Sequence, residues 1–211
     1  MKWFKKNWLW LLIGLLALLP IINLVSLIET SGFPKLMVNY PDGLLENPAL
    51  KGKEITPFWF PIHSTGEWAI RWLTFSLICT PLNILFGWKQ ILKVRKTTGL
   101  WAFTYSLVHV LFFIWERNLL ALFEEVNFIL GLISFSIMLP LALTSNKKSH
   151  RLLKKTWVKL HRYAYVAGIL AVIHVILAER GWELYAILIS IGFVIRIPAI
   201  KKTPGGVSKQ K

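Results

Sequence analysis

The sequence has little cysteine and few acidic residues. Cys79 is the only cysteine among 211 residues, which excludes an intramolecular disulfide and a thiolate metal cluster. We expect this residue to pack as a small side chain between helices. Only 10 residues are acidic against 25 lysines and arginines. The chain also has no glycine-rich nucleotide loop and no dinucleotide fingerprint, so we do not expect it to use a nicotinamide cofactor by itself.

Apolar residues, in contrast, are abundant. They make up 55% of the chain, which is more than a soluble domain of this size tolerates. A helix needs about 20 residues to cross a bilayer. Six apolar segments qualify when short ones are extended at their ends: residues 8–28, 68–88, 99–115, 127–144, 163–178 and 184–200. The predicted fold class is an all-α membrane protein, a bundle of six transmembrane helices. The first segment is too long for a signal peptide, so we expect an anchor.

The charges predict the orientation of this bundle. Nineteen of the 25 basic residues lie in residues 2–6, 89–96, 147–162 and 196–211. All 10 acidic residues lie toward the other side. Because lysine and arginine resist translocation, both termini are predicted to be cytoplasmic. The net charge of +15 is therefore a sign of topology and does not indicate nucleic-acid binding.

The first outer connection, residues 29–61, carries five prolines and is longer than a helix turn needs. It is interpreted either as a surface loop or as a docking surface for an external partner. The C-terminal tail is predicted to be disordered. No internal repeat is evident in the sequence.

Two histidines are predicted to lie at the same depth. His109 precedes Glu116 by seven residues and His174 precedes Glu179 by five, in segments that run in the same direction. Ionisable side chains inside a membrane are rare and usually functional. Two imidazoles with no carboxylate between them suit haem iron, because the porphyrin supplies the other four ligands; zinc would need more protein ligands. The alternative is a pair of histidines that only pack helices.

A third histidine, His161, lies about 20 Å of helix away from His174. Counting back the same distance from His109 leads to Arg95 and Lys96. On an ideal helix His161 and His174 would point about 140° apart, unless the helix tilts or is overwound near Gly168. His161 is therefore either an interfacial histidine or the ligand of a second haem.

Other polar residues have two interpretations each. His63 opens the second segment and is either an interfacial residue or a contact for quinone or for a haem propionate. Arg71 either pairs with a propionate or extends to the outer surface. The basic residues of 147–159, together with Arg95 and Lys96, are explained by topology or by a phosphate-bearing ligand such as flavin mononucleotide.

Four stretches resemble a known family. The runs RKTTGLWAFTYSLVH, HSTGEWAIRWLTFSLICTPL, LALTS and WVKLHRYAYVAGILAVIH are similar to the ferric-reductase-like transmembrane domain. They are most similar to its bacterial branch of haem-binding subunits in periplasmic protein-methionine-sulfoxide reductase systems. Arg95-Lys96 stands where this branch is expected to have Arg-Arg, which weakens a bidentate phosphate contact.

The resemblance implies a function and a division into domains. His109 and His174 would ligate haem b, and His161 would serve an inner site. Electrons would come from the quinone pool, with FMN as a second cofactor. They would pass to a periplasmic molybdopterin reductase that repairs methionine sulfoxide, from a multi-pass subunit in the bacterial inner membrane. The expected regions are an anchor with the long loop (1–61), a haem-binding four-helix core (62–178), and a last helix with a basic tail (179–211).

Two alternatives remain at this point. One is a transmembrane b-type cytochrome that reduces ferric iron or another external acceptor. The other is a non-redox helix bundle, although the sequence lacks the midplane acids and broken helices of coupled transporters. If the chain is a reductase subunit, as the resemblance implies, or a b-type cytochrome, we expect it to be an electron-transfer subunit of an oxidoreductase and not a complete enzyme.

Overall fold

The computed structural model of the chain describes residues 2–29, 37–38, 58–178 and 181–196. Within these ranges the chain is almost entirely helical, with one short antiparallel pair of strands. The elements in chain order are α1 (Lys2–Leu27), β1 (Ile28–Glu29), β2 (Met37–Val38), α2 (Trp59–Phe86), α3 (Ile91–Arg117), the 3-10 helix η2 (Leu120–Phe123), α4 (Val126–Leu143), α5 (Lys147–His161), α6 (Ala164–Leu177) and α7 (Glu183–Ile195). Most of the long first connection, which is interpreted as a surface loop or a docking surface, lies outside the described residues. The whole C-terminal tail, which is predicted to be disordered, also lies outside them.

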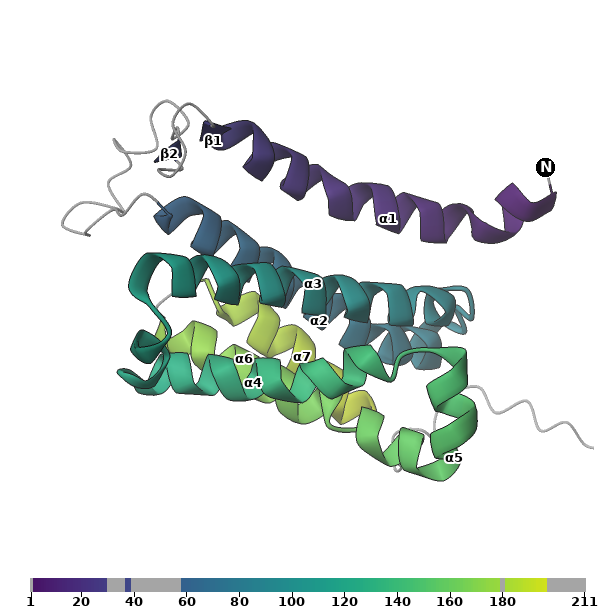
Figure 1. Cartoon of the computed structure of the whole chain (residues 1–211). Coiled ribbons are helices and arrows are strands. Elements are labelled where there is room, and N and C mark those ends of the chain that lie inside the picture. Colours follow the sequence, from purple (N-terminus) through teal and green to yellow (C-terminus); the bar gives the residue numbers. More distant parts are fainter. Residues whose placement is uncertain (1, 30–36, 39–57, 179–180, 197–211) are drawn as a thin grey trace, which may run out of the picture.

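The helices α2, α3, α4 and α6 form the centre of the bundle. The helices α2 and α3 pack along each other, as do α4 and α6, while α7 packs on α2 and α1 on α3. Figure 1 shows the start of α1, the α2–α3 turn and α5 at one end of the bundle, which we call the α5 end. The opposite end, where η2 connects α3 to α4, is the η2 end. The short helix α5 projects beyond the bundle.

Four helical segments are long and apolar enough to cross a membrane: Trp59–Phe86, Ile91–Arg117, Val126–Leu143 and the joined α5–α6 segment Lys147–Leu177. Two shorter apolar stretches, Trp8–Ile22 and Glu183–Ile195, correspond to the first and last predicted segments. The helices α2 and α3 begin well before residues 68 and 99, where we expected them. Pro61 suits the first turn of a helix, and the basic start of α3 continues the helix beyond its apolar part, so hydropathy alone underestimated both.

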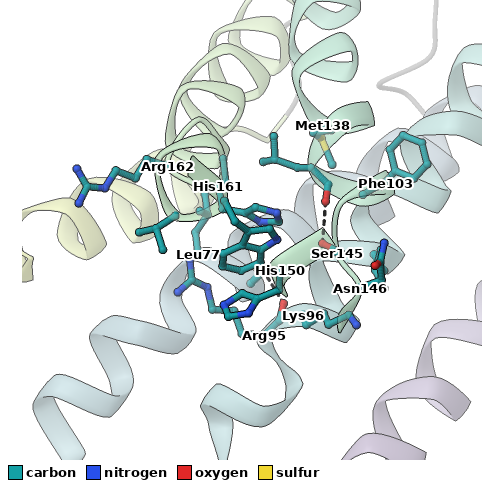
Figure 2. A pocket seen from close by; sticks show the side chains of 18 of the residues that line it. Leu77, Arg95, Lys96, Phe103, Met138, Ser145, Asn146, His150, His161 and Arg162 are labelled. Carbon is teal, nitrogen blue, oxygen red and sulfur yellow. Dashed lines mark hydrogen bonds between the residues drawn. The ribbon is translucent and has the colours of Figure 1, made fainter. Parts of the chain in front are cut away.

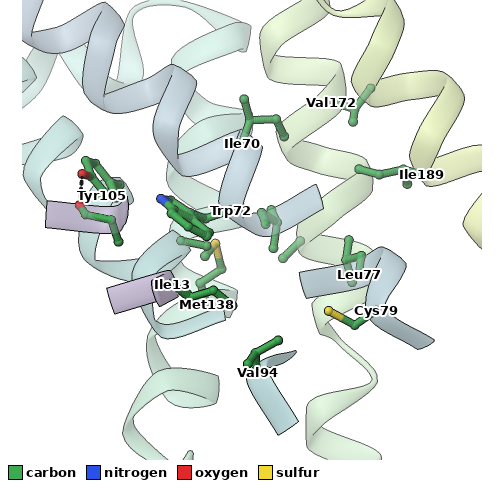
Figure 3. Packing of buried hydrophobic residues seen from close by; sticks show 14 of the residues in the cluster. Ile13, Ile70, Trp72, Leu77, Cys79, Val94, Tyr105, Met138, Val172 and Ile189 are labelled. Atoms are coloured by element: carbon green, nitrogen blue, oxygen red, sulfur yellow. Dashed lines mark hydrogen bonds between the residues drawn. The ribbon is translucent and has the colours of Figure 1, made fainter. Parts of the chain in front are cut away.

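The core lies where α2 meets its neighbours (Figure 3). Its buried members come from six helices and include Ile13, Trp72, Tyr105, Met138, Val172 and Ile189. Cys79 is fully buried among them, as predicted for a packing residue. The hydroxyl of Tyr105 donates to the backbone carbonyl of Ala17, which fastens α1 to the bundle.

The connection between α5 and α6 explains how His161 and His174 are oriented. Three backbone bonds, from Arg162, Tyr163 and Tyr165, reach back only three residues, so the chain is tightened there as in a 3-10 helix. The sequence allows the helix to be overwound near Gly168, whereas in the structure the chain is tightened at residues 159–165. His161 ends α5 and His174 belongs to α6, so the angle calculated for one ideal helix does not apply.

Candidate histidine site between two pairs of helices

His109 of α3 and His174 of α6 face each other near the η2 end. Their ring centres are 6.3 Å apart and their ring planes are inclined at 73°. The expectation that these two side chains meet at one level rested on counting residues, and the structure brings them together. Both are half-buried between helices.

The hydrogen bonds of the two rings leave the same nitrogen available on each. Nδ1 of His109 lies 2.7 Å from the carbonyl oxygen of Ile62, and Nδ1 of His174 lies 2.7 Å from that of Asn127. A carbonyl oxygen only accepts, so each Nδ1 carries the proton and donates it. Each Nε2 therefore has a lone pair. A backbone carbonyl on the other ring nitrogen is the usual partner of a metal-binding histidine.

This arrangement occurs twice with the same spacing. In both halves the histidine lies 47 residues after its carbonyl partner. Asn127 follows Ile62 by 65 residues, as His174 follows His109. The helix pairs α2–α3 and α4–α6 are thus equivalent units that run in the same direction, the kind of parallel repeat found in membrane bundles. We saw no repeat in the sequence, because this one is a repeat of geometry carried by very few identical residues.

Two cavities flank the histidine pair, and both rings line each of them. The larger, of about 420 Å³, is also lined by Arg117, Asn127 and Tyr185. The smaller, of about 110 Å³, has mostly apolar walls that include Phe135 and Met138. The space around the two imidazoles is therefore apolar on one side and carries polar groups on the other.

The donor set suits a metal that brings most of its own ligands. A metal bound to both Nε2 atoms needs bonds of about 2.0–2.1 Å on each side, and ring centres 6.3 Å apart leave room for one ion between the rings. No group of three or more histidine, cysteine, aspartate or glutamate side chains that could hold a metal occurs in the described part of the chain. The residues present thus fit haem iron, which takes four ligands from the porphyrin.

His63 and Arg71 lie at the larger cavity, on the same helix as Ile62. Arg71 forms an ion pair of 2.7 Å with Glu67 and lies over the ring of Trp68 at 4.8 Å. Its side chain is 43% exposed, so the arginine is reachable from the cavity and from outside. His63 stacks on Trp59, with ring centres 4.3 Å apart, and its Nδ1 donates to the carbonyl of the same residue. Their roles toward a cofactor stay predictions.

A separate chamber of about 650 Å³ lies at the α5 end, and we call it the α5-end chamber. His161, Arg95 and Lys96 all line it, which brings together three residues that the sequence had suggested for an inner site. Figure 2 shows His161 facing the chamber with Arg95 below it and Lys96 nearby. Nε2 of His161 lies 3.1 Å from the hydroxyl of Thr144.

The chamber does not repeat the histidine pair. The position 65 residues before His161 is Lys96, so α3 contributes an amine where α5 contributes an imidazole. His150 also lines the chamber, but both imidazoles contact Trp157. His161 is stacked on the indole with ring centres 3.8 Å apart, and His150 meets it in a T-shaped arrangement with ring centres 4.8 Å apart. A second site with two axial histidines is therefore not formed by the described residues around this chamber.

Some residues around these sites were missed from the sequence. Tryptophans near helix ends are typical of membrane interfaces, and Trp157 fits that pattern, yet its indole donates to the carbonyl of Thr144 and its ring stacks on His161. Arg196 was counted as a basic residue of the tail, whereas its guanidinium lies over Tyr165 at 4.6 Å and donates to the carbonyl of Leu77. The only feature of the sequence that could have indicated these contacts is the position of Arg196 at the end of an apolar helix.

The fold and the site together define a helical membrane protein in which two equivalent helix pairs present one imidazole each. Comparison with known proteins gives the family. The family described as ferric reductase like transmembrane component matches residues 65–177, which is more than half of the chain, and the chain belongs to this family. Its membership and its four long apolar helices make it a multi-pass membrane protein. No solved structure is significantly similar.

Several curated proteins are similar to the same region. A protein-methionine-sulfoxide reductase heme-binding subunit MsrQ from Xanthomonas campestris pv. campestris is 36% identical over 119 residues, which is 53% of this chain and 55% of that protein. The MsrQ of Xanthomonas euvesicatoria pv. vesicatoria is 34% identical over 119 residues, with the same coverage. The magnetosome protein MamZ of Paramagnetospirillum magneticum is 36% identical over 132 residues, 59% of this chain and 20% of MamZ. The chain thus spans about half the length of the MsrQ proteins and a fifth of MamZ.

Proposed function

We propose that the protein is a haem-binding electron-transfer subunit of a membrane oxidoreductase. The observation that carries the proposal is the pair of imidazoles whose Nδ1 atoms donate to backbone carbonyls and whose Nε2 atoms are left to bind one metal. The similarity to proteins named heme-binding subunits supports the same cofactor. We take the haem to be of the b type, with no covalent bond between the porphyrin and the protein.

In this proposal each part of the site has a physical task. His109 and His174 would hold the haem iron, and the carbonyls of Ile62 and Asn127 fix their tautomer and would raise their basicity as ligands. When haem is bound, its iron supplies one-electron chemistry. The apolar walls, among them Phe135 and Met138, keep water away from the rings. Proton transfer by side chains is not required, because axial ligation and local dielectric set the reduction potential.

The polar wall suits the charged edge of the cofactor. Arg71 and Arg117 line the larger cavity next to both histidines. A guanidinium forms strong charge-assisted hydrogen bonds with carboxylates, and propionate groups carry charges that need compensation in a medium of low dielectric. We therefore assign Arg71 to a propionate and leave His63 as a polar contact at the cavity entrance, for a propionate or for quinone.

The α5-end chamber would serve the entry of electrons. We propose that Arg95, Lys96 and the basic residues of α5 hold a phosphate-bearing cofactor there, such as FMN, or a second haem with His161 as one ligand. The volume of about 650 Å³ is in the range of small-molecule sites. By the distribution of charge, the α5 end faces the cytoplasm of a bacterial inner membrane. Both termini lie on that side in this proposal.

The finer proposal concerns the redox partners. Electrons from the quinone pool would reach haem b and leave at the η2 end to a periplasmic molybdopterin-containing reductase that repairs methionine sulfoxide in proteins. The similarity to MsrQ proteins over 53% of the chain supports it. Residues 62–178 would be the haem-binding core. Residues 1–61 would form an anchor with the long outer loop, and residues 179–211 a last transmembrane helix with a basic cytoplasmic tail. The test is whether quinol-reduced protein in nanodiscs is reoxidised by such a reductase with oxidised methionine present.

The haem itself is tested by a visible spectrum of the full chain purified in detergent with haemin supplied. We expect reduced b-type bands in the wild type and their loss in His109→Ala and in His174→Ala. His150→Ala is the matched control. This imidazole is exposed, lines the α5-end chamber and plays no part in the His109–His174 pair. A colourless wild type would overturn the proposal, and a wild-type spectrum in either pair variant would show that the ligands are wrong.

A further inference from the structure

Two glycines lie directly against the two imidazoles. A Cβ atom on Gly66 of α2 would come within 3.1 Å of Nδ1 and of Cε1 of His109. A Cβ atom on Gly131 of α4 would come within 3.1 Å of the same two atoms of His174. These contacts are closer than an ordinary Cβ contact, so an added methyl group would force the ring to shift by a few tenths of an ångström.

Each glycine also lies one helical turn after the carbonyl that holds the ring. Gly66 follows Ile62, and Gly131 follows Asn127, by four residues in both cases. The edge of each imidazole therefore lies in the notch that the missing side chain leaves on the neighbouring helix. From this notch Nδ1 reaches the carbonyl oxygen at 2.7 Å. The notch limits the rotation of the ring, and the hydrogen bond sets its direction.

The other described glycines do not have this relation to a histidine. Gly14, Gly87 and Gly181 have nothing within 4 Å of an added Cβ. Gly192 would make only ordinary contacts with Pro81 and Ile78, and Gly99 and Gly168 face Ser76 and Leu77. Contact with an imidazole is thus limited, among the described residues, to the two glycines at equivalent positions of the two helix pairs.

We propose that Gly66 and Gly131 are positioning residues that fix the planes of the two axial imidazoles, and that the steep angle of 73° between the rings is a property that these notches maintain. The inference rests on the proposed function, because it needs both histidines to bind one iron. The angle between two axial imidazole planes determines how the iron d orbitals are split, and hence the g values of the oxidised low-spin haem. Ligand orientation is also one of the means by which a protein adjusts a haem.

The experiment is low-temperature electron paramagnetic resonance of the oxidised full-length protein with haem bound. Rings at a steep angle give a highly anisotropic low-spin signal dominated by one low-field feature, whereas parallel rings give a rhombic spectrum with three resolved features. We expect the first kind in the wild type. In Gly66→Ala and in Gly131→Ala we expect the low-field feature to move, because one ring must turn away from its notch. Gly192→Ala, a helical glycine with ordinary contacts, should overlay the wild type.

The outcomes separate the inference from the proposed function. A wild type without low-spin haem would refute the function itself. A wild type with low-spin haem but the rhombic spectrum of parallel rings would refute the inference alone, without relying on any variant. The inference is likewise refuted if both alanine variants bind haem and overlay the wild type. If an alanine variant stays folded and monodisperse but loses haem while Gly192→Ala retains it, the glycine is required to bring the ligand into place, as the inference states.

Discussion

Phe103 and Phe135 stack on each other, with ring centres 5.6 Å apart and ring planes only 6° from parallel. Phe103 of α3 lines the α5-end chamber, and Phe135 of α4 lines the small cavity beside the histidine pair. Leu73 and Met138 line both spaces. The wall between the two spaces is therefore made of packed apolar side chains. The stacked phenylalanines join α3 to α4 and so connect the two helix pairs.

The stacked pair should contribute measurably to the packing of the two helix pairs. Aromatic pairs contribute about 0.5–1.5 kcal/mol beyond their buried area, so Phe103→Leu and Phe135→Leu should be less destabilising together than the sum of the two single changes. A double-mutant cycle on reversible unfolding in mixed micelles measures this coupling. Additive effects would mean that the rings touch without stabilising each other.

The ion pair between Arg71 and Glu67 at the larger cavity predicts the direction in which each substitution shifts the midpoint potential of the haem. Because a positive charge near the iron favours the reduced state, Arg71→Gln should lower the midpoint potential of the haem by tens of millivolts. Glu67→Gln should raise it, since it removes the negative partner that lies 2.7 Å from Arg71. Both side chains are about half exposed, so added salt should reduce both shifts. Potentiometric titration of the visible bands tests the pair, and shifts in the same direction for both variants would contradict it.

His161 should not affect the histidine pair. Its ring lies in the α5-end chamber, bonded to Thr144 and stacked on Trp157, so His161→Ala should retain the low-spin spectrum of His109 and His174. A haem or flavin bound in the chamber should be lost or weakened in the same variant. Cofactor content per protein measures this, and Thr144→Val is a milder variant that removes the hydroxyl beside Nε2 of His161 but keeps the imidazole. Loss of the main low-spin signal in His161→Ala would show that the ligands are wrongly paired.

The contact between α1 and the bundle can be tested through one hydroxyl. Tyr105→Phe removes the hydrogen bond to the carbonyl of Ala17, and one such bond is worth about 1 kcal/mol. The rate of backbone amide hydrogen exchange should then increase more in α1 than in α4. Tyr163→Phe, at a residue that is 56% exposed, is the control and should leave α1 unchanged. Equal exchange of α1 in both variants would mean that this bond does not hold the helix.

Much of the bundle could be predicted from the sequence because hydropathy and charge act along the chain. Counting residues back from Glu116 and Glu179 was enough to bring His109 and His174 to one level, since two parallel helices rise by the same amount per residue. The burial of Cys79 could also be predicted, because the residues next to it in the sequence are apolar. These features depend only on the helix itself and on the membrane around it.

Other features could not be predicted because they depend on contacts between helices. The tight turn at residues 159–165 changes the direction of His161 without a glycine or proline in the segment to indicate it. The contact of Trp157 with His161 is local, since the two residues lie one turn apart on α5. The hydrogen bond from the Trp157 indole to the carbonyl of Thr144, in contrast, depends on how α5 follows α4. The equivalence of α2–α3 and α4–α6 escaped detection because hardly any residue type is shared across the 65-residue interval, while the carbonyls that hold the rings belong to the backbone and leave no mark in the sequence.

The equivalence of the two helix pairs means that one hairpin contains half of the site. A designed peptide with α2 and α3 alone carries a notch, a carbonyl and a single imidazole; two identical copies, related by a rotation about the bundle axis, would meet with their imidazoles opposed. The two halves of the natural chain differ in two respects among the described residues. An amine lies opposite an imidazole at the α5 end, and the arginines that line the larger cavity belong to α2 and α3. If the proposed function holds, the direction of electron flow would depend on the differences between the halves, while iron binding would depend on what they have in common.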